Sequence, residues 1–263
     1  MPGRGNVAAV TARLEHDAGG IARITIARPE VRNAFDAALI ARLVDLVHGV
    51  APNARAVVLQ SEGPVFCAGA DVNWMRAVAA ESREVNVEDA QALAGLFATL
   101  DGLPMPLVVK VQGPAIGGGA GLVAVGDIVI ASTDAWFQFA EVRVGIIPSV
   151  VSPYVLRKLG PSFTTAAFIT AERFDAARAY EAGLVHRVTR PDELEGAVDD
   201  TLAEIRKGSP AAIRAAKRLV RQVAGHTPQE VRELTIRTIA DIRATREAQE
   251  GFHAFVERRA PKW

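Results

Sequence analysis

Two glycine-rich segments carry the pattern that points most directly to chemistry. Residues 66–71 read FCAGAD and residues 112–121 read QGPAIGGGAG, and each follows a short apolar run. Successive glycines at a helix entrance let the backbone approach a ligand closely and leave N–H groups unpaired. Two such segments at the ends of neighbouring strands could aim one N–H each at a single oxygen and form an oxyanion hole. The same glycines would equally allow tight helix–strand packing, so spacing alone leaves both interpretations open.

Other catalytic patterns find little support in the sequence. Residues 119–124 match the dinucleotide fingerprint G-x-G-x-x-A, but Gly126 interrupts the crossover helix that this fingerprint requires. The five histidines do not pair with one another or with the single cysteine at helical spacing, and that one cysteine, Cys67, excludes a multi-cysteine metal site. We therefore expect neither a nicotinamide cofactor nor a metal.

Alternating strands and helices must position the two glycine segments. Short apolar runs predict strands over residues 8–14, 21–27, 56–60, 107–112 and 128–131, and helical periodicity predicts helices over 36–48 and 91–100. The first two strands, separated by Gly19-Gly20, suggest a hairpin. Strands that alternate with helices argue for an α/β core with parallel pairing.

The chain changes character after residue 195. Ser209 followed by Pro210 is a helix start, and Thr227-Pro228 opens a second helical stretch that runs towards Val256. The sequence thus predicts an α/β body over residues 1–195 and an all-helical region over 196–263, which we expect to serve packing or assembly.

Composition limits the partners and the compartment. The 263 residues are 49% hydrophobic and 23% charged, the balance of a soluble globular chain. Thirty basic and thirty acidic residues cancel, so no net field gathers nucleic acid or acidic lipid. The N-terminus lacks an apolar run of signal-peptide length, and glycines break up the longest uncharged run, residues 111–126. We expect a soluble, cytoplasmic protein that binds neither nucleic acid nor membrane.

Over essentially its whole length, the sequence resembles the crotonase (enoyl-CoA hydratase/isomerase) superfamily. The segments that carry the resemblance are RPEVRNAFD (28–36), FCAGADVNWM (66–75), VQGPAIGGGAGLVAVGDIVIAS (111–132), FAEVRVGIIPS (139–149) and TAERFDAARAYEAGLVHRV (170–188). The resemblance implies an α/β fold with a spiral core of ββα units and a C-terminal helical trimerisation region. It also implies a homotrimer or homohexamer and an acyl-CoA thioester substrate, so that CoA enters with the substrate and no separate cofactor is needed.

The resemblance assigns roles to individual residues. It places the oxyanion hole on the N–H groups of Ala68 and Gly118, and the acid–base carboxylate on Glu141. A thioester stabilises negative charge at its α-carbon as an enolate, and donors aimed at the enolate oxygen act most strongly in the transition state. Further residues expected to contact the substrate are Gly69, Ala70, Asp71 and Gly117 beside the hole, with Arg28 and Arg32 towards the adenosine end of CoA.

One position departs from the family's pattern. Family hydratases usually carry a second glutamate three residues after Gly118, where this sequence has Gly121. Two carboxylates can hold a water and deliver a proton, whereas one carboxylate must do both in sequence. The family's isomerases often work with a single glutamate, so Gly121 by itself favours an isomerase.

Other segments favour a hydratase. GGGAGLV, VRVGIIPSVVSPYVLRKLG and TAERFDAARAYEAGLV resemble the bacterial 3-methylglutaconyl-CoA hydratase branch of leucine degradation, which tends to carry glycine at the same position. We therefore expect hydration of a 2-enoyl-CoA, branched or carboxylated. The alternatives are a Δ3,Δ2-enoyl-CoA isomerase that uses Glu141 alone and a CoA-binding protein without activity. Candidate partners for a second substrate carboxylate are Arg76, Arg83, Lys110 and Arg143, and Ser149 or Ser152 could replace the missing glutamate.

Overall fold

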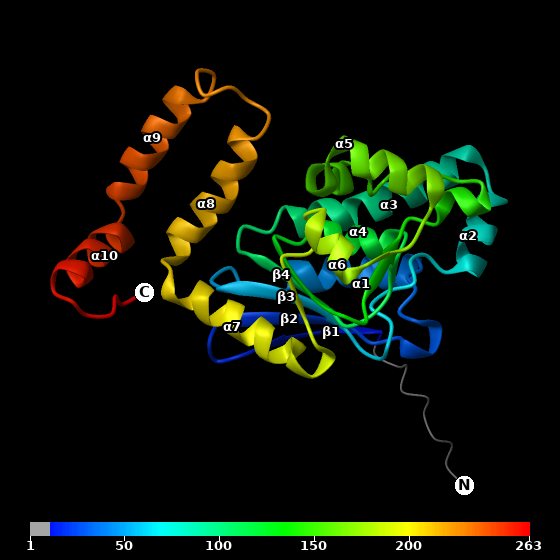
Figure 1. Cartoon of the computed structure of the whole chain (residues 1–263), viewed down its shortest axis with the longest axis horizontal. Coiled ribbons are helices and arrows are strands. Elements are labelled where there is room, and N and C mark those ends of the chain that lie inside the picture. Colours follow the sequence, from blue (N-terminus) through cyan, green and yellow to red (C-terminus); the bar gives the residue numbers. More distant parts are fainter. Residues whose placement is uncertain (1–10) are drawn as a thin grey trace, which may run out of the picture.

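A computed structural model describes residues 11–263 and contains a central six-stranded sheet of order β1-β2-β3-β4-β6-β9 (Figure 1). Its strands are β1 (Ala12–His16), β2 (Ile21–Ile26), β3 (Ala56–Ser61), β4 (Leu107–Val111), β6 (Ile128–Ser132) and β9 (Arg187–Thr189). The β1–β2 hairpin is antiparallel, and every other pair in this sheet is parallel. A smaller sheet consists of β5 (Ala115–Ile116), β7 (Trp136–Gln138) and β8 (Phe174–Asp175).

Helices cover both faces of the six-stranded sheet. They are α1 (Ala37–His48), α2 (Val72–Ala79), α3 (Arg83–Asp101), α4 (Gly118–Ala124), α5 (Ser152–Thr170), α6 (Ala176–Glu181) and α7 (Leu194–Lys207), with short 3-10 turns η1 (Pro29–Val31), η2 (Glu141–Val144) and η3 (Pro191–Glu193). Val57 and Leu59 of β3 point into the larger core, whereas Val58 points to the other face, where it packs with α7. This alternation is the period of two that a strand imposes.

Helix α7 belongs to the α/β body, although its residues lie almost wholly in the region predicted to be a separate helical part. Its apolar side chains, among them Leu194, Val198 and Leu202, form a compact cluster with the sheet. The chain leaves the body only with α8 (Pro210–Val223), α9 (Arg232–Arg243) and α10 (Arg246–Val256), which extend to one side in Figure 1. We call residues 209–263 the C-terminal arm.

The predicted α/β class is confirmed, and the local differences have physical causes. The helix predicted over 91–100 is the second half of α3, which begins earlier because the Ser82 side chain accepts a hydrogen bond from the amide of Val85. The single helical stretch predicted up to Val256 is wrong, because α9 ends at Arg243 and Thr245 caps a new helix, α10, by accepting from the amide of Ala248. Residues 8–10 of the first predicted strand lie outside the described residues.

The arm packs sparsely on the rest of the chain. Helix α8 is held by Arg214, whose guanidinium donates to the carbonyls of Pro52 and Ala54, and by a salt bridge between Arg221 and Asp101. Helix α9 has no buried residue, and Phe255 of α10 is 86% exposed. In the part of the chain that the structure describes, no helix is long and apolar enough to cross a membrane.

Candidate active site

The two glycine segments lie side by side beyond the carboxyl ends of β3 and β4. A parallel bridge joins them: the amide of Cys67 donates to the carbonyl of Pro114 at 3.2 Å, and the amide of Ile116 donates to the carbonyl of Cys67 at 2.9 Å. Ligands of open α/β sheets bind outside the carboxyl ends of the strands. The topology therefore brings both segments to the edge where a ligand site is expected.

The main-chain amides of the first segment differ in availability. The amide of Ala68, expected to be one donor of the oxyanion hole, is already occupied because it donates to the carbonyl of Arg32 at 3.0 Å. Arg32 has a left-handed backbone, with φ of 56°, where the chain turns after η1. The amide of Ala70 donates no hydrogen bond within residues 11–263. Among the amides of Ala68 and Ala70, the free one is that of Ala70.

The second segment presents a matching free amide. Gly117 donates its N–H to the carbonyl of Gln138 at 2.8 Å, and the first bond of α4 runs from the amide of Gly121 to the carbonyl of Gly117. Gly118, the first residue of α4, therefore keeps an N–H that no group of the described chain accepts. A β-carbon placed on Gly69 would lie 3.6 Å from the nitrogen of Gly118, so the two loops are in close contact.

Glu141 lies beside the glycine loop, at the start of η2. A β-carbon on Gly117 would lie 3.0 Å from the Oε1 atom of Glu141. The Oε2 atom is buried and has no hydrogen-bond partner among the described residues. Burial raises the pKa of the Glu141 carboxyl above its ordinary value, because the charged form is poorly solvated; a hydrogen bond from its own amide opposes this shift. The result is a carboxyl group suited to exchanging a proton.

The position of the missing glutamate is filled. A β-carbon on Gly121 would overlap the side chain of Val151 and would lie 3.1 Å from Cε1 of Phe97. Val151 and Phe97 are both buried. The site therefore has an apolar wall where a second carboxylate would stand.

Comparisons with known proteins identify the family. Residues 16–263 match the Enoyl-CoA hydratase/isomerase protein family. The chain belongs to this family. An enoyl-CoA hydratase from Shewanella pealeana is similar in structure, with a TM-score of 0.92 and 35% identity over 97% of this chain and 96% of that one.

Two relatives of known name illustrate the range of activities in the family. A 2,3-dehydroadipyl-CoA hydratase from Escherichia coli is 30% identical over 90% of this chain and 92% of its own. A trans-2-decenoyl-acyl-carrier-protein isomerase from Streptococcus mutans is 29% identical over 93% of this chain and 94% of its own. The family thus includes both reaction types weighed from the sequence.

Three other residues of this hydratase/isomerase family member were predicted to contact the substrate, and each has different neighbours. The Asp71 carboxylate caps α2 by accepting from the amides of Asn73 and Trp74. The Arg28 guanidinium pairs with Asp36 at 2.9 Å and donates to the carbonyl of Ala34. Arg32 is exposed and forms no ion pair within residues 11–263.

The residues predicted to bind a second substrate carboxylate or to replace the missing glutamate do not lie together. Lys110 pairs with Glu195 of α7, so it is committed to the opposite face of the sheet. Arg76, Arg83 and Arg143 are exposed, and Arg143 lies on the same turn as Glu141. Ser152 donates its hydroxyl to the carbonyl of Ser149 at 2.7 Å, and neither serine bonds to Glu141 in the described part of the chain.

Asn33, which is not among the predicted site residues, holds the loop before α1. Its fully buried side chain donates to the carbonyls of Glu62 and Val65 and accepts from the amide of Arg28. These bonds tie the turn that carries Arg32 to the loop after β3. One sequence signal was present, because asparagine is enriched at left-handed positions and Asn33 has a φ of 55°.

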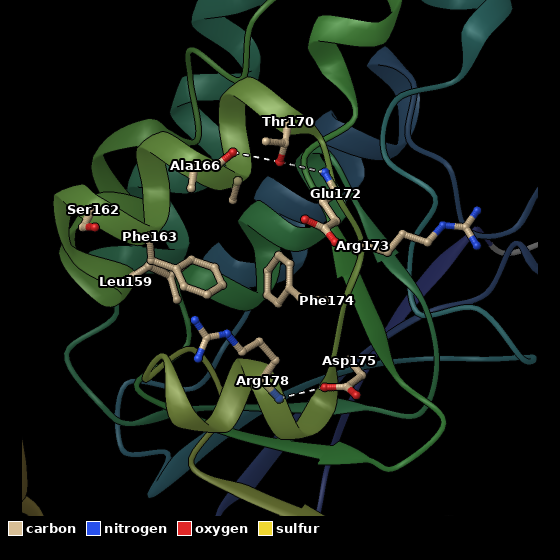
Figure 2. Close-up of a pocket in the computed structure, with 11 residues that line it drawn as sticks. Leu159, Ser162, Phe163, Ala166, Thr170, Glu172, Arg173, Phe174, Asp175 and Arg178 are labelled. Atoms are coloured by element: carbon tan, nitrogen blue, oxygen red, sulfur yellow. Dashed lines mark hydrogen bonds between the residues drawn. The ribbon is translucent and has the colours of Figure 1, made fainter.

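A separate cavity lies away from these loops, between α5, β8 and α6 (Figure 2). Phe163 and Phe174 line it, and the Arg178 guanidinium lies over the Phe163 ring at 5.3 Å. Neither Glu141 nor either glycine loop contributes to its lining. The cavity is therefore distinct from the candidate active site.

Proposed function

We propose that the protein is an acyl-CoA enzyme that holds the thioester oxygen of its substrate between the N–H groups of Ala70 and Gly118. Glu141 exchanges a proton beside this oxygen. The observation that carries the proposal is the buried carboxylate oxygen of Glu141, which has no partner among residues 11–263 and lies beside the glycine that precedes Gly118. A removable oxyanion-hole donor contributes about 10²–10³ in rate in other enzymes.

The reaction we propose is reversible hydration of a 2-enoyl-CoA. Glu141 takes a proton from water, the water oxygen bonds to C3, and Glu141 returns a proton to C2 of the resulting enolate. A raised pKa suits a group that must both accept and donate a proton near neutral pH. Hydratases among the relatives of this chain support this choice.

The acyl group we propose is branched or carboxylated, of the 3-methylglutaconyl type. The Escherichia coli relative is named for 2,3-dehydroadipyl-CoA, whose acyl group carries a free carboxylate in addition to the thioester. The exposed cations Arg76, Arg83 and Arg143 are the groups of this chain that we assign to such a carboxylate.

A Δ3,Δ2-enoyl-CoA isomerase is the second candidate, and the filled space at Gly121 favours it. Val151 and Phe97 fill the space that a side chain at position 121 would need, so no carboxylate there can help Glu141 to hold a water. A double-bond shift needs no ordered water, because a single carboxylate can remove a proton from C2 and return it at C4.

Isotope labelling separates the two reactions. The purified protein is incubated with crotonyl-CoA, 3-methylglutaconyl-CoA and 3-hexenoyl-CoA in oxygen-18 water. Hydration predicts oxygen-18 at C3 of the products from the 2-enoyl esters. Conversion of 3-hexenoyl-CoA alone, without oxygen uptake, would establish the isomerase. Binding of CoA esters without any turnover would instead indicate a CoA-binding protein that has lost its activity.

We further propose that the enzyme works in the cytoplasm as a homotrimer or homohexamer, without a metal or a separate cofactor. Apolar side chains left exposed on the C-terminal arm, including Ile236, Ile239 and Phe255, support assembly through this region. Light scattering at micromolar concentration is expected to give a mass three or six times that of the 27.9 kDa chain. A monomer mass would refute the assembly while leaving the chemistry untouched.

A further inference from the structure

The two loops with free amides share one neighbour, Phe35, which is fully buried between η1 and α1. The main chain of Phe35 brackets Ala70. Its N–H donates to the carbonyl of Gly69 at 2.9 Å, and its carbonyl accepts from the amide of Asp71 at 2.9 Å. Because polar groups alternate sides along an extended segment, the N–H of Ala70 faces away from Phe35. Phe35 thereby sets the position and direction of the Ala70 amide.

The ring of Phe35 reaches the other loop. A β-carbon placed on Gly118 would overlap the Cζ atom of this ring and would lie 3.2 Å from both of its Cε atoms. These three ring atoms are the nearest neighbours of that position. The tip of the ring therefore packs against the backbone of Gly118, and no larger residue fits there.

We infer that Phe35 is a positioning residue that sets the distance between the amides of Ala70 and Gly118. The inference rests on the proposed function, in which both amides bind one thioester oxygen. Effective donors lie about 2.7–3.1 Å from that oxygen, so a small shift of either loop lengthens one of the two bonds. A rigid ring fixed to one loop by its backbone and touching the other with its tip holds this spacing.

The first test replaces the ring by a shorter side chain in Phe35→Leu. Hydrogen bonds to the thioester carbonyl lower its stretching frequency, which isotope-edited infrared spectroscopy measures on bound crotonyl-CoA. We expect Phe35→Leu to lose part of this downshift and to lower kcat about 10- to 100-fold, with KM changed less than about threefold. The control is Phe174→Leu, whose ring packs on other phenylalanines instead of the loops and whose loss should leave the downshift unchanged.

The second test keeps the inference open to refutation if Phe35→Leu folds poorly. Gly118→Ala alone should be inactive or unstable, because its β-carbon collides with the ring. Phe35→Leu removes the colliding atoms, so the double variant Phe35→Leu/Gly118→Ala should be more stable and more active than Gly118→Ala. Strictly additive losses in the double variant would overturn the proposed contact.

Glu141→Gln distinguishes failure of this inference from failure of the proposed function. This variant leaves the amides of Ala70 and Gly118 unchanged. The carbonyl of bound crotonyl-CoA should therefore keep its full downshift while turnover is lost. A wild-type complex without any downshift would refute the oxyanion hole and, with it, the role of Phe35. If the wild type shows the downshift, and Phe35→Leu shows the same downshift and the same kcat, the role of Phe35 is refuted while the oxyanion hole stands.

Discussion

Gly118 and Gly121 lie one turn apart on the same short helix, yet their main-chain amides differ. Gly118 is partly exposed, and its amide has no acceptor among the described residues. Gly121 is buried, and Val151 and Phe97 occupy the space that any side chain would need. Glycine allows close packing at both positions, against Phe35 at Gly118 and against Val151 at Gly121, but only Gly118 also keeps its amide without an acceptor among the described residues.

This difference divides the candidate site into two sides. On the amide side, main-chain N–H groups supply the polarity, and the side chains around them determine only where the loops lie. On the proton side, the carboxyl of Glu141 supplies the polarity, and Val151 and Phe97 fill the space that a second carboxylate at position 121 would need. A side-chain substitution should therefore abolish chemistry on the proton side and change mainly geometry or stability on the amide side.

The largest expected effect is that of Glu141→Gln, which removes the acid–base group and preserves its shape. We expect kcat to fall about 10³-fold, within the usual contribution of a positioned acid or base, with acyl-CoA binding retained. Steady-state kinetics and calorimetric titration with a CoA ester measure the two quantities. Glu172→Gln, which changes an exposed carboxylate at the cavity of Figure 2, is the matched control. Equal kcat values for both variants would contradict the division of the site.

Next in size is the loss of stability in Asn33→Ala on the amide side. The substitution removes three partly buried hydrogen bonds, those to the carbonyls of Glu62 and Val65 and the one from the amide of Arg28, so we expect the free energy of unfolding to fall by about 3 kcal/mol. Urea denaturation measures the change. Asn73→Ala, an exposed position on α2, should change it by less than about 0.5 kcal/mol.

Gly121→Ala should destabilise the protein by about 1–3 kcal/mol through overpacking against Val151. Gly95→Ala is the matched control, because this exposed glycine within α3 has open space around a β-carbon. That control should stabilise by about 0.5–1 kcal/mol, since alanine favours the helix. Changes of the same sign at both positions would show that Gly121 is not tightly packed. Gly121→Glu, for the same reason, should fail to raise hydratase activity.

The smallest expected effect is a pH-dependent gain in stability for Glu141→Gln. Burial raises the pKa of Glu141, so the folded state holds this proton more tightly than the unfolded state does. As pH rises from below the unfolded value through the raised one, wild type loses stability because a buried carboxylate must be charged. The glutamine variant avoids this loss, so it should be the more stable protein at pH 7 and lose the advantage in acid. Denaturation curves at both pH values test the sign, and a constant difference would contradict it.

Sequence patterns predicted much of the framework because they reflect local physical chemistry. Apolar runs marked the central strands, and Ser209-Pro210 marked the start of α8, whose N-cap is Ser209. The ordered motifs pointed to the correct family and to both glycine loops. Boundaries failed where side-chain caps decided them, as at Ser82 and Thr245.

By itself, then, the sequence determined the fold class, the family and the two loops that meet beyond the strands. Only the tertiary structure decided which amides in those loops are free, since the acceptor that occupies Ala68 is the carbonyl of Arg32, far away along the chain. Tertiary packing likewise placed Val151 and Phe97 in the space beside Gly121. Hydrogen-bond partners and packing neighbours that are remote in sequence leave no local pattern, which is why motifs located the loops without resolving which of their groups remain available.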